Sequence, residues 1–369
     1  MKTYFRKKTK QIRIGNVLIG GGAPVSIQSM TNTDTRDPQK SLAQIRQLAD
    51  AGCQIVRLAV PDMAAAEAMQ DITAQSPVPV IADIHFDYRL ALRSIEAGVH
   101  GIRINPGNIG SAERVRAVVE AAGNKNIPIR VGANSGSLPQ GLMEEKLQQG
   151  IPHNEAMAIC LTEAVMTQIR LLEECHFDQI KVSLKASSVP VTVAAYRHFA
   201  EICDYPLHIG VTEAGTAWRG SIKSAVGIGS LLLDGIGDTL RVSLTADPVE
   251  EVRTARAILE SAGIRDAVPE IVSCPTCGRT AYDMFALIRQ VEDFVDSLKR
   301  SGKTLQMKKI AVMGCVVNGP GEAKDAELGI AGGGENGKLV IFRYGKPFKV
   351  LPQEQAFPEF QRCILEFCQ

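Results

Sequence analysis

Short apolar segments alternate with longer amphipathic segments along residues 25–263. A polar loop and a helical pattern that ends near a glycine follow each apolar segment. The apolar segments comprise residues 25–31, 54–60, 79–85, 101–105, 128–134, 179–187, 207–215 and 238–247. Strands that alternate with helices are typical of parallel sheets with right-handed crossovers. Eight such units, in about the usual barrel length, favour a closed (β/α)₈ barrel over an open doubly wound sheet.

The ends of the predicted helices carry local signals. Asp37 and Pro38 mark the start of the first helix in this region, and Asp247 and Pro248 mark the start of the last. An Asp at the N-cap accepts hydrogen bonds from free backbone amides, and Pro fits the first helical turn. The last helix ends before Gly263. We therefore predict that the barrel domain comprises residues 1–265.

The pattern changes after residue 263. Two cysteine-containing segments, a helical pattern over residues 281–300, a glycine-rich stretch and a pair of strand patterns over residues 338–351 follow. About 100 residues are enough to form a separate core. We therefore expect an α/β chain in which the barrel is followed by a smaller α+β domain over residues 266–369.

The balance of charges limits the classes of partner. The chain has 41 Lys and Arg residues against 40 Asp and Glu residues, a formal net charge of +1. Because this balance gives no global positive field, it argues against non-specific binding to nucleic acid or to a membrane surface. No segment approaches the roughly 18 apolar residues of a membrane span.

The N-terminal residues begin basic and become apolar, as in a signal peptide. Asn16 and the glycines at positions 20–22 interrupt the apolar part, and no small-residue cleavage site follows. We interpret this segment as a short hairpin with a basic lead. Nine cysteines in a chain without a recognisable export signal favour a reducing cytoplasm, where clustered cysteines bind metals more often than they form disulfides.

The strongest chemical signal lies in the second domain. Cys274 and Cys277 form a CxxC pair, and Cys315 begins the segment CVVNGPGE, which ends at Glu322. A glycine-rich turn before Glu322 can bring its carboxylate back toward Cys315. Three thiolates and one carboxylate are therefore four candidate metal ligands.

The identity of the metal stays open from spacing alone. A structural zinc site usually has a second CxxC-like pair or histidines, and the sequence has no histidine after His208. An iron–sulfur cluster held by three cysteines leaves one iron for an exchangeable ligand. The spacing favours a cluster, with zinc or ordinary buried or free cysteines as alternatives.

A second group of residues lies at or beyond the C-terminal halves of the predicted strands. It consists of Arg57, Arg103, Asn105, Arg130, Asn134, Lys181, Lys185, Arg241 and Ser243. The pattern leaves open whether the arginines point into the barrel or toward the helices. Active sites of such barrels lie at this end of the strands, and a buried arginine is costly unless it is paired. We expect an anionic ligand with more than one phosphate or carboxylate, with internal salt bridges as the alternative.

Glu213 follows the seventh predicted strand, at the start of a loop. In this position it is either a catalytic acid or the partner of an arginine, and the sequence does not separate the two roles. His85, in the segment ADIHFD, is interpreted as a hydrogen-bonded structural histidine.

Together these motifs resemble those of the 4-hydroxy-3-methylbut-2-enyl diphosphate synthases of the methylerythritol phosphate pathway. The CPTC pair and the segment MGCVVNGPGE carry the most specific likeness, and IRINPGN, IRVGANSGSL and IGVTEAG support it. The likeness covers essentially the whole chain. Because no further domain is inserted, the chain is similar to the bacterial two-domain form.

This resemblance implies an oxidoreductase of isoprenoid precursor biosynthesis. The implied reaction is the reductive ring opening and dehydration of 2-C-methyl-D-erythritol 2,4-cyclodiphosphate to (E)-4-hydroxy-3-methylbut-2-enyl diphosphate. Two electrons would come from flavodoxin or ferredoxin, between which the sequence does not distinguish. The resemblance also implies a cytoplasmic homodimer in which the cluster domain of one subunit covers the barrel of the other.

The resemblance assigns roles to the candidate residues. It implies a [4Fe-4S] cluster bound by Cys274, Cys277, Cys315 and Glu322. It implies that the cyclic diphosphate is bound by Arg57, Arg103, Asn105, Arg130, Asn134, Lys185, Arg241 and Ser243. We add the hypothesis that Glu213 is the catalytic proton donor.

Two other classes of function stay open at this point. One is a zinc-stabilised barrel transferase of the pterin-binding type, without redox chemistry, and the other is a non-catalytic iron–sulfur sensor. Brown colour with absorbance near 400 nm after anaerobic purification would exclude the zinc protein. Tight binding of a cyclic diphosphate would count against the sensor.

Overall fold

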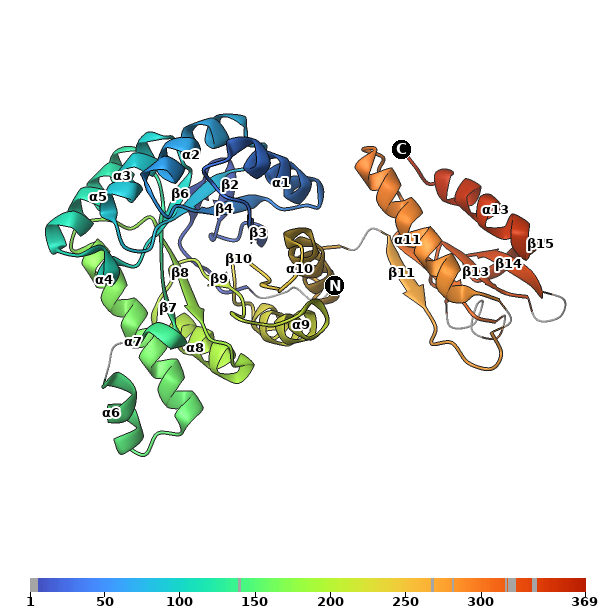
Figure 1. Ribbon diagram of the computed structural model, residues 1–369. Coiled ribbons are helices and arrows are strands. Elements are labelled where there is room, and N and C mark those ends of the chain that lie inside the picture. The colour runs from blue at the N-terminus through green and yellow to red at the C-terminus, as the bar shows by residue number, and fades with distance from the viewer. Residues whose placement is uncertain are drawn as a thin grey trace. The chain divides into compact units, whose positions relative to one another are not determined.

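The computed structural model (Figure 1) describes residues 6–138, 141–266, 269–280, 282–315, 317, 323–333 and 337–369. The chain forms two compact units, Met1–Arg265 and Asp266–Gln369. Among the described residues, no helix combines the length and the apolar character that crossing a membrane requires.

The first unit contains a parallel β-barrel. Its strands are β3 (Ser26–Met30), β4 (Ile55–Ala59), β5 (Val80–Asp83), β6 (Gly101–Arg103), β7 (Ile129–Asn134), β8 (Ile180–Lys185), β9 (His208–Ile209) and β10 (Thr239–Leu240). They pair in parallel in the order β8-β7-β6-β5-β4-β3-β10-β9. A parallel bridge between Val182 and Leu207 brings the two outermost strands together. Each of the eight predicted segments contains one of these strands, which confirms the (β/α)₈ barrel.

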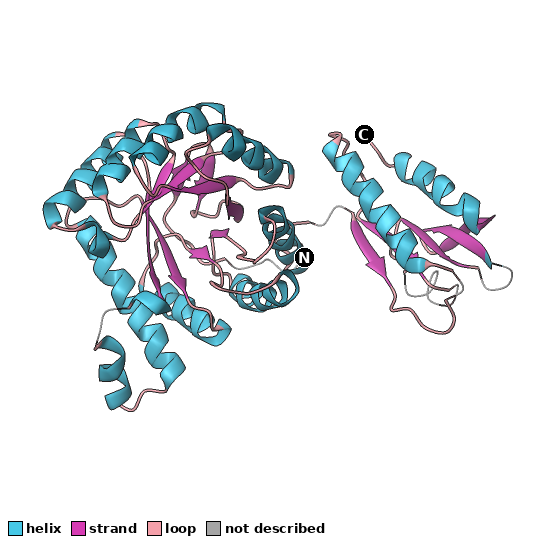
Figure 2. Ribbon diagram, in the orientation of Figure 1, coloured by secondary structure: helices cyan, strands magenta, loops and turns pink. Residues whose placement is uncertain are grey.

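Helices surround the strands of this unit (Figure 2). They are α1 (Pro38–Asp50), α2 (Met63–Gln75), α3 (Tyr88–Glu96), α4 (Pro106–Ile109), α5 (Ala112–Asn124), α6 (Leu142–Gln148), α7 (His153–Glu173), α8 (Val189–Ile202), α9 (Ala217–Leu233) and α10 (Pro248–Ser261). The predicted caps are formed, because the side chains of Asp37 and Asp247 accept hydrogen bonds from the backbone amides of Lys40 and Val249.

Side chains alternate between two environments along the barrel strands. Leu207 and Ile209 on β9 belong to the hydrophobic core that also contains residues of the surrounding helices. His208, which lies between them, therefore points into the barrel. The same rule assigns every other residue of each strand to the interior.

A hairpin closes the barrel at the N-terminal ends of its strands. Strands β1 (Ile12–Ile14) and β2 (Val17–Ile19) pair in antiparallel fashion. Their isoleucines form a small apolar cluster with Ile55 and Ile81. The hairpin confirms the interpretation of this segment from sequence, and it leaves the opposite end of the barrel for a ligand.

The second unit is built on a five-stranded sheet. The strands are β11 (Glu270–Ser273), β12 (Lys309–Met313), β13 (Leu328–Gly332), β14 (Lys338–Arg343) and β15 (Lys346–Pro352), in that order across the sheet. The first three are parallel, and the last two pairings are antiparallel. Helices α11 (Met284–Arg300) and α13 (Gln353–Leu365) contribute to one hydrophobic core with this sheet. This mixed arrangement agrees with the expected α+β domain.

Candidate functional site

The predicted cationic residues line the interior of the barrel. On β4, Val56 and Leu58 belong to the core shared with the helices, so Arg57 between them faces inward. The same alternation places further cations inside, namely Arg103, Arg130, Lys181, Lys185 and Arg241. The question that the sequence left open is therefore answered: the arginines point into the barrel.

One buried carboxylate contacts two of these arginines. Asp83, at the end of β5, is 3% exposed. Its Oδ2 lies 3.4 Å from Nε of Arg57, and its Oδ1 accepts a hydrogen bond of 3.1 Å from Nη1 of Arg103. Burial raises the pKa of Asp83, but Arg57, Arg103 and Arg130 outweigh this effect and lower the pKa below its usual 3.8. Asp83 is therefore ionised at neutral pH.

A second buried carboxylate holds Arg241. Oε2 and Oε1 of Glu251, on α10, lie 3.2 Å from Nε and 3.2 Å from Nη2 of Arg241, a two-pronged contact. The same carboxylate accepts hydrogen bonds from the backbone amide of Leu244 and from the hydroxyl of Ser29. Internal salt bridges, the alternative from sequence, are therefore present at Arg57, Arg103 and Arg241.

Arg130 differs from the other three arginines. It is 5% exposed, and within the described residues its Nε and Nη1 have no hydrogen-bond partner. Burial lowers its pKa well below the usual 12.5, and the nearby Arg57 and Arg103 lower it further. Unpaired buried guanidinium donors indicate a site that an anion completes.

Two lysines and a histidine add to the polar interior. Nζ of Lys181 donates a hydrogen bond of 3.2 Å to Oε1 of Gln28, and this bond runs from β8 to β3 across the barrel. Burial, together with Arg130 and Arg57, lowers the pKa of Lys181 and of Lys185 well below the usual 10.5. His208 is fully buried, and neither ring nitrogen has a hydrogen-bond partner in the described part of the chain.

The predicted asparagines form local turns at the strand ends. Oδ1 of Asn105 accepts a hydrogen bond from the amide of Gly107 at the start of α4, and Oδ1 of Asn134 accepts one from the amide of Gly136. Each asparagine thus fixes the loop that follows its strand. Ser243 follows β10 and is partly exposed. Binding of substrate by these three residues stays a prediction.

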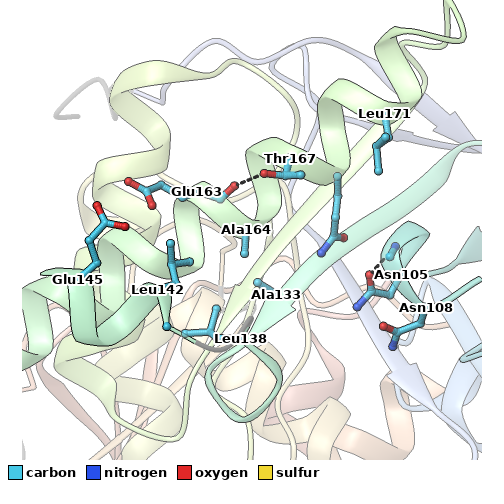
Figure 3. Close-up of a pocket in the computed structure, with 13 residues that line it drawn as sticks. Asn105, Asn108, Ala133, Leu138, Leu142, Glu145, Glu163, Ala164, Thr167 and Leu171 are labelled. Atoms are coloured by element: carbon cyan, nitrogen blue, oxygen red, sulfur yellow. Dashed lines mark hydrogen bonds between the residues drawn. The ribbon is translucent and has the colours of Figure 1, made fainter. Parts of the chain in front are cut away.

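A cavity of about 640 Å³ is lined by residues of α4, α6 and α7, among others. Figure 3 shows Asn105 and Asn108 on one side of it and Glu163 and Thr167 of α7 on another. The four interior arginines are not among the residues that line it. Of the predicted site residues, Asn105 is the one that lines this cavity.

Glu213 has an unusual backbone. Its φ of +50° lies in the left-handed region, which non-glycine residues adopt with strain. The side chain is exposed, and among the described residues it forms no ion pair or hydrogen bond. The alternative in which Glu213 pairs with an arginine of the described chain is not observed, so its carboxylate is available to a ligand.

Two of the predicted metal-binding cysteines follow neighbouring strands of the second unit. Cys274 follows β11, and Cys315 follows β12 after Gly314. These strands are adjacent and parallel, so both cysteines lie at the same edge of the sheet. The amide of Gly314 donates a hydrogen bond of 3.2 Å to Sγ of Cys274. Hydrogen bonds of this kind stabilise a thiolate and tune a bound metal.

Cys277 lies on the loop after Cys274 and is exposed. Its amide lies 3.5 Å from Oγ1 of Thr280, and a Cβ on Gly314 would lie 2.4 Å from the same oxygen. Burial raises the pKa of Tyr282, and the nearby Cys274 and Cys315 raise it further. Sulfur ligands and close backbone approach suit a thiolate-bound iron–sulfur cluster or zinc.

The complete ligand set is not observed. Glu322 lies outside the described residues. Within the part of the chain that is described, no three His, Cys, Asp or Glu side chains lie close enough together to hold a metal ion. Metal binding by Cys274, Cys277, Cys315 and Glu322 therefore stays a prediction.

Comparison with known proteins covers both units. Residues 9–256 match the GcpE TIM-barrel domain, and residues 270–366 match the GcpE protein C-terminal domain. The chain belongs to the GcpE family. This membership does not support the pterin-binding transferase or the sensor as alternatives.

Relatives of this GcpE chain are similar over nearly their full length. The 4-hydroxy-3-methylbut-2-en-1-yl diphosphate synthase (flavodoxin) of Geobacter sulfurreducens is 55% identical over 94% of this chain and 94% of its own. The protein of that name from Clostridium perfringens is 51% identical over 97% of this chain and 99% of its own. Among solved structures, Yersinia pestis dihydropteroate synthase covers 69% of this chain, and 99% of its own, at 12% identity, with a TM-score of 0.47.

The sequence did not reveal the two carboxylates of this GcpE barrel. In the sequence, Asp83 lies at the end of a predicted strand and Glu251 lies at the start of a predicted helix, and neither position indicates an arginine partner. Their roles depend on which strands are neighbours and on how α10 packs. The one available signal for Asp83 was its inward position at the end of a predicted strand.

Proposed function

We propose that this GcpE chain catalyses the reductive ring opening and dehydration of 2-C-methyl-D-erythritol 2,4-cyclodiphosphate to (E)-4-hydroxy-3-methylbut-2-enyl diphosphate. Relatives that are about half identical over nearly their full length carry the name of this product's synthase. The observation that carries the proposal is Arg130, whose Nε and Nη1 have no hydrogen-bond partner in the described chain, within a group of buried cations. A diphosphate supplies the charge and the acceptors that such a group requires.

The reaction sets three tasks for the protein. It must bind the diphosphate, supply two electrons, and supply a proton so that the C3 hydroxyl leaves as water. The bond between C2 and its diphosphate oxygen breaks. The diphosphate stays attached through the oxygen on C4. Two electrons and two protons balance the conversion when both compounds are written as neutral acids.

The barrel performs the first task. Arg57 and Arg103 present guanidinium groups that both contact Asp83, and Arg130 presents donors with no partner among the described residues. Phosphate oxygens accept paired hydrogen bonds from such groups. Lys185, Arg241, Asn105, Asn134 and Ser243 complete the proposed binding set.

Glu213 performs the proton-transfer task. Its exposed carboxylate, unpaired within the described residues, can carry a proton to the leaving hydroxyl. Backbone strain of the kind seen at Glu213 is common at catalytic positions. A Glu213→Gln variant that retained full reductive turnover with its iron intact would disprove this role.

For the electron-transfer task, Cys274, Cys277, Cys315 and Glu322 would hold a [4Fe-4S] cluster. When bound, such a cluster passes single electrons and offers one iron as a Lewis acid for an oxygen ligand. The three thiolates would retain it, and the carboxylate of Glu322 would be the exchangeable ligand. Flavodoxin appears in the names of the relatives, and we propose it as the electron donor, with ferredoxin as the alternative. We also propose that the enzyme is a cytoplasmic homodimer.

Anaerobic turnover with an artificial reductant tests this function. The iron-loaded intact chain should form the linear diphosphate from the cyclodiphosphate, and Cys315→Ser should lose at least about a hundredfold in kcat, as expected when a cluster ligand is removed. Cys368→Ser, in the same unit but outside the proposed ligand set, should retain turnover. An iron-free, inactive intact chain after reconstitution would contradict the proposal.

A further inference from the structure

Asp83 lies between the strands that carry two of the substrate-binding arginines. In the sheet, β5 separates β4 from β6. Asp83 pairs in register with Ala59 on one side and with Arg103 on the other. Its side chain faces the interior and is 3% exposed. A single carboxylate is therefore fixed, by the backbone ladder, within reach of both neighbouring strands.

The two oxygens of Asp83 contact different arginines. Oδ2 is 3.4 Å from Nε of Arg57, and Oδ1 is 3.1 Å from Nη1 of Arg103. A guanidinium group has five N–H donors in a fixed plane. Arg103 directs one donor to Asp83, whereas Arg57 forms an ion pair with Asp83 and donates from Nε and Nη2 to Sδ of Met30. The carboxylate thus fixes where both guanidinium groups lie, while other donors of Arg103 stay available to a ligand.

The carboxylate also separates two like charges. Burial lowers the pKa of Arg57 to about 10, and Arg241 and Arg103 add to this effect, whereas Asp83 opposes it. Without Asp83, Arg57 and Arg103 would repel each other in a low-dielectric interior. Their side chains would then move apart, and the paired geometry would be lost.

A carboxylate does not bind a diphosphate directly, because both are anions. Removing Asp83 therefore has two opposite effects on an anionic substrate. It removes a repulsive charge, which favours binding, and it releases the two arginines, which weakens binding. Paired, directed hydrogen bonds to phosphate are lost when geometry is lost, so we expect the second effect to dominate.

We propose that Asp83 is a positioning residue that presets Arg57 and Arg103 for the diphosphate without contacting it. The proposal rests on the proposed function, because the cyclic diphosphate is the ligand that these arginines would bind. It assigns to Asp83 an effect on substrate affinity rather than on the chemical step.

The test compares two substitutions of Asp83, of which one removes the negative charge and the other keeps it. Asp83→Asn removes the charge and keeps the size, whereas Asp83→Glu keeps the charge and displaces the oxygens by one methylene. Both should raise KM for the cyclodiphosphate at least about tenfold, equivalent to about 1.4 kcal/mol, with kcat changed less than about threefold. Asp34→Asn is the matched control, since Asp34 forms an exposed pair with Arg36, and its KM should equal that of the wild type.

A double variant separates positioning from general damage to the fold. An Arg103→Ala background lacks one of the two arginines that Asp83 positions. The fold-increase in KM caused by Asp83→Asn should therefore be at least about threefold smaller in this background than in the wild type. Equal fold-changes in the two backgrounds would overturn the proposal. An Asp83→Asn or Asp83→Glu enzyme with unchanged or lower KM would also overturn it.

The activity of the wild type distinguishes failure of the proposed function from failure of the proposed role of Asp83. If the iron-loaded wild type does not convert the cyclodiphosphate, the proposed function fails. If it does, and KM is insensitive to both substitutions at position 83, only the role of Asp83 fails. Asp83→Glu retains the buried charge balance, so it gives a result even if Asp83→Asn does not fold.

Discussion

Arg130 carries its charge in the barrel interior with two donor atoms that have no partner in the described chain. Arg57, Arg103 and Arg241 each have a carboxylate contact. Asp83 offsets part of the charge of Arg130 but forms no salt bridge with it, and a buried cation without a salt bridge weakens the folded state until an anion arrives. At this position, stability and ligand binding should therefore respond to substitution in opposite directions.

Arg130→Met tests whether stability and ligand binding change in opposite directions. Without substrate, the variant should unfold at the same temperature as the wild type or at a higher one, because an unpaired buried charge is replaced by an apolar chain of similar length. KM for the cyclodiphosphate should rise at least about a hundredfold, or about 2.7 kcal/mol. Thermal unfolding and steady-state kinetics measure the two effects, and Arg253→Met, at an exposed arginine on α10, is the control. A clear drop in Tm for Arg130→Met would contradict the account.

His208 gives a prediction for acid stability. Burial, together with Lys185, Arg130 and Lys181, lowers its pKa well below the usual 6.5. As pH falls below 6.5, His208 binds a proton in the unfolded chain but not in the folded chain. The folded state therefore loses stability relative to the unfolded state, by up to about 1.4 kcal/mol per pH unit.

His208→Gln should remove this contribution. Between pH 7.5 and pH 5, its free energy of unfolding should fall less steeply than that of the wild type, as measured by chemical denaturation at each pH. His153→Gln, at an exposed position, should follow the wild-type curve. Parallel curves for His208→Gln and the wild type would show that His208 titrates normally.

At the scale of elements, the ends of parallel strands bring the chemistry together. Cys274 and Cys315 follow β11 and β12, and the backbone amide of Gly314 donates a hydrogen bond to Sγ of Cys274. A Cβ at Gly314 would meet Oγ1 of Thr280 at 2.4 Å, whereas the other atoms of Thr280 nearest to it lie at 3.4 Å. One side-chain atom therefore accounts for the steric requirement for glycine here.

Gly314→Ala should displace the loop that carries Cys277 and reduce the iron bound after anaerobic reconstitution to less than about half, since a ligand set must keep its geometry to hold its metal. Gly314→Ala combined with Thr280→Ala removes the clashing oxygen and should restore much of the iron. Thr280→Ala alone is the control. Equal iron content in Gly314→Ala and the wild type would contradict the close approach.

Sequence periodicity predicted every barrel strand, but not the length of each. The predicted segments at residues 207–215 and 238–247 contain only the short strands β9 (His208–Ile209) and β10 (Thr239–Leu240). Gly210 and the residues after β10 still fit the apolar pattern, yet they make no regular ladder. Hydrophobic pattern reports which side of a strand is buried, whereas ladder hydrogen bonds depend on neighbours that the local sequence does not specify.

The candidate site was predictable to a similar degree. Strand-end position identified the arginines, and CxxC spacing identified the cysteines, because both signals are local. The partners of the arginines were not predictable: Asp83 meets Arg57 through strand order, and Glu251 meets Arg241 through the packing of α10. Such pairs join segments that are distant in sequence, so only the fold brings them together.

At the scale of the whole molecule, the proposed reaction is divided between two compact units. The barrel offers buried cations for a diphosphate, and the second unit offers cysteines for a redox cluster. The buried cations do not account for the presence of the cysteines, and the cysteines do not account for the buried cations. A zinc-stabilised transferase would use the cysteines without electron transfer, and a sensor would not require the buried arginines.

The ratio of electrons consumed to product formed tests this division most directly. The measurement uses the iron-loaded, full-length chain under anaerobic conditions, with a titrated artificial reductant and the cyclodiphosphate. The account predicts two electrons oxidised for each molecule of linear diphosphate formed. Product that appears without consumption of reductant, or reductant consumed without conversion of the cyclodiphosphate, would contradict it.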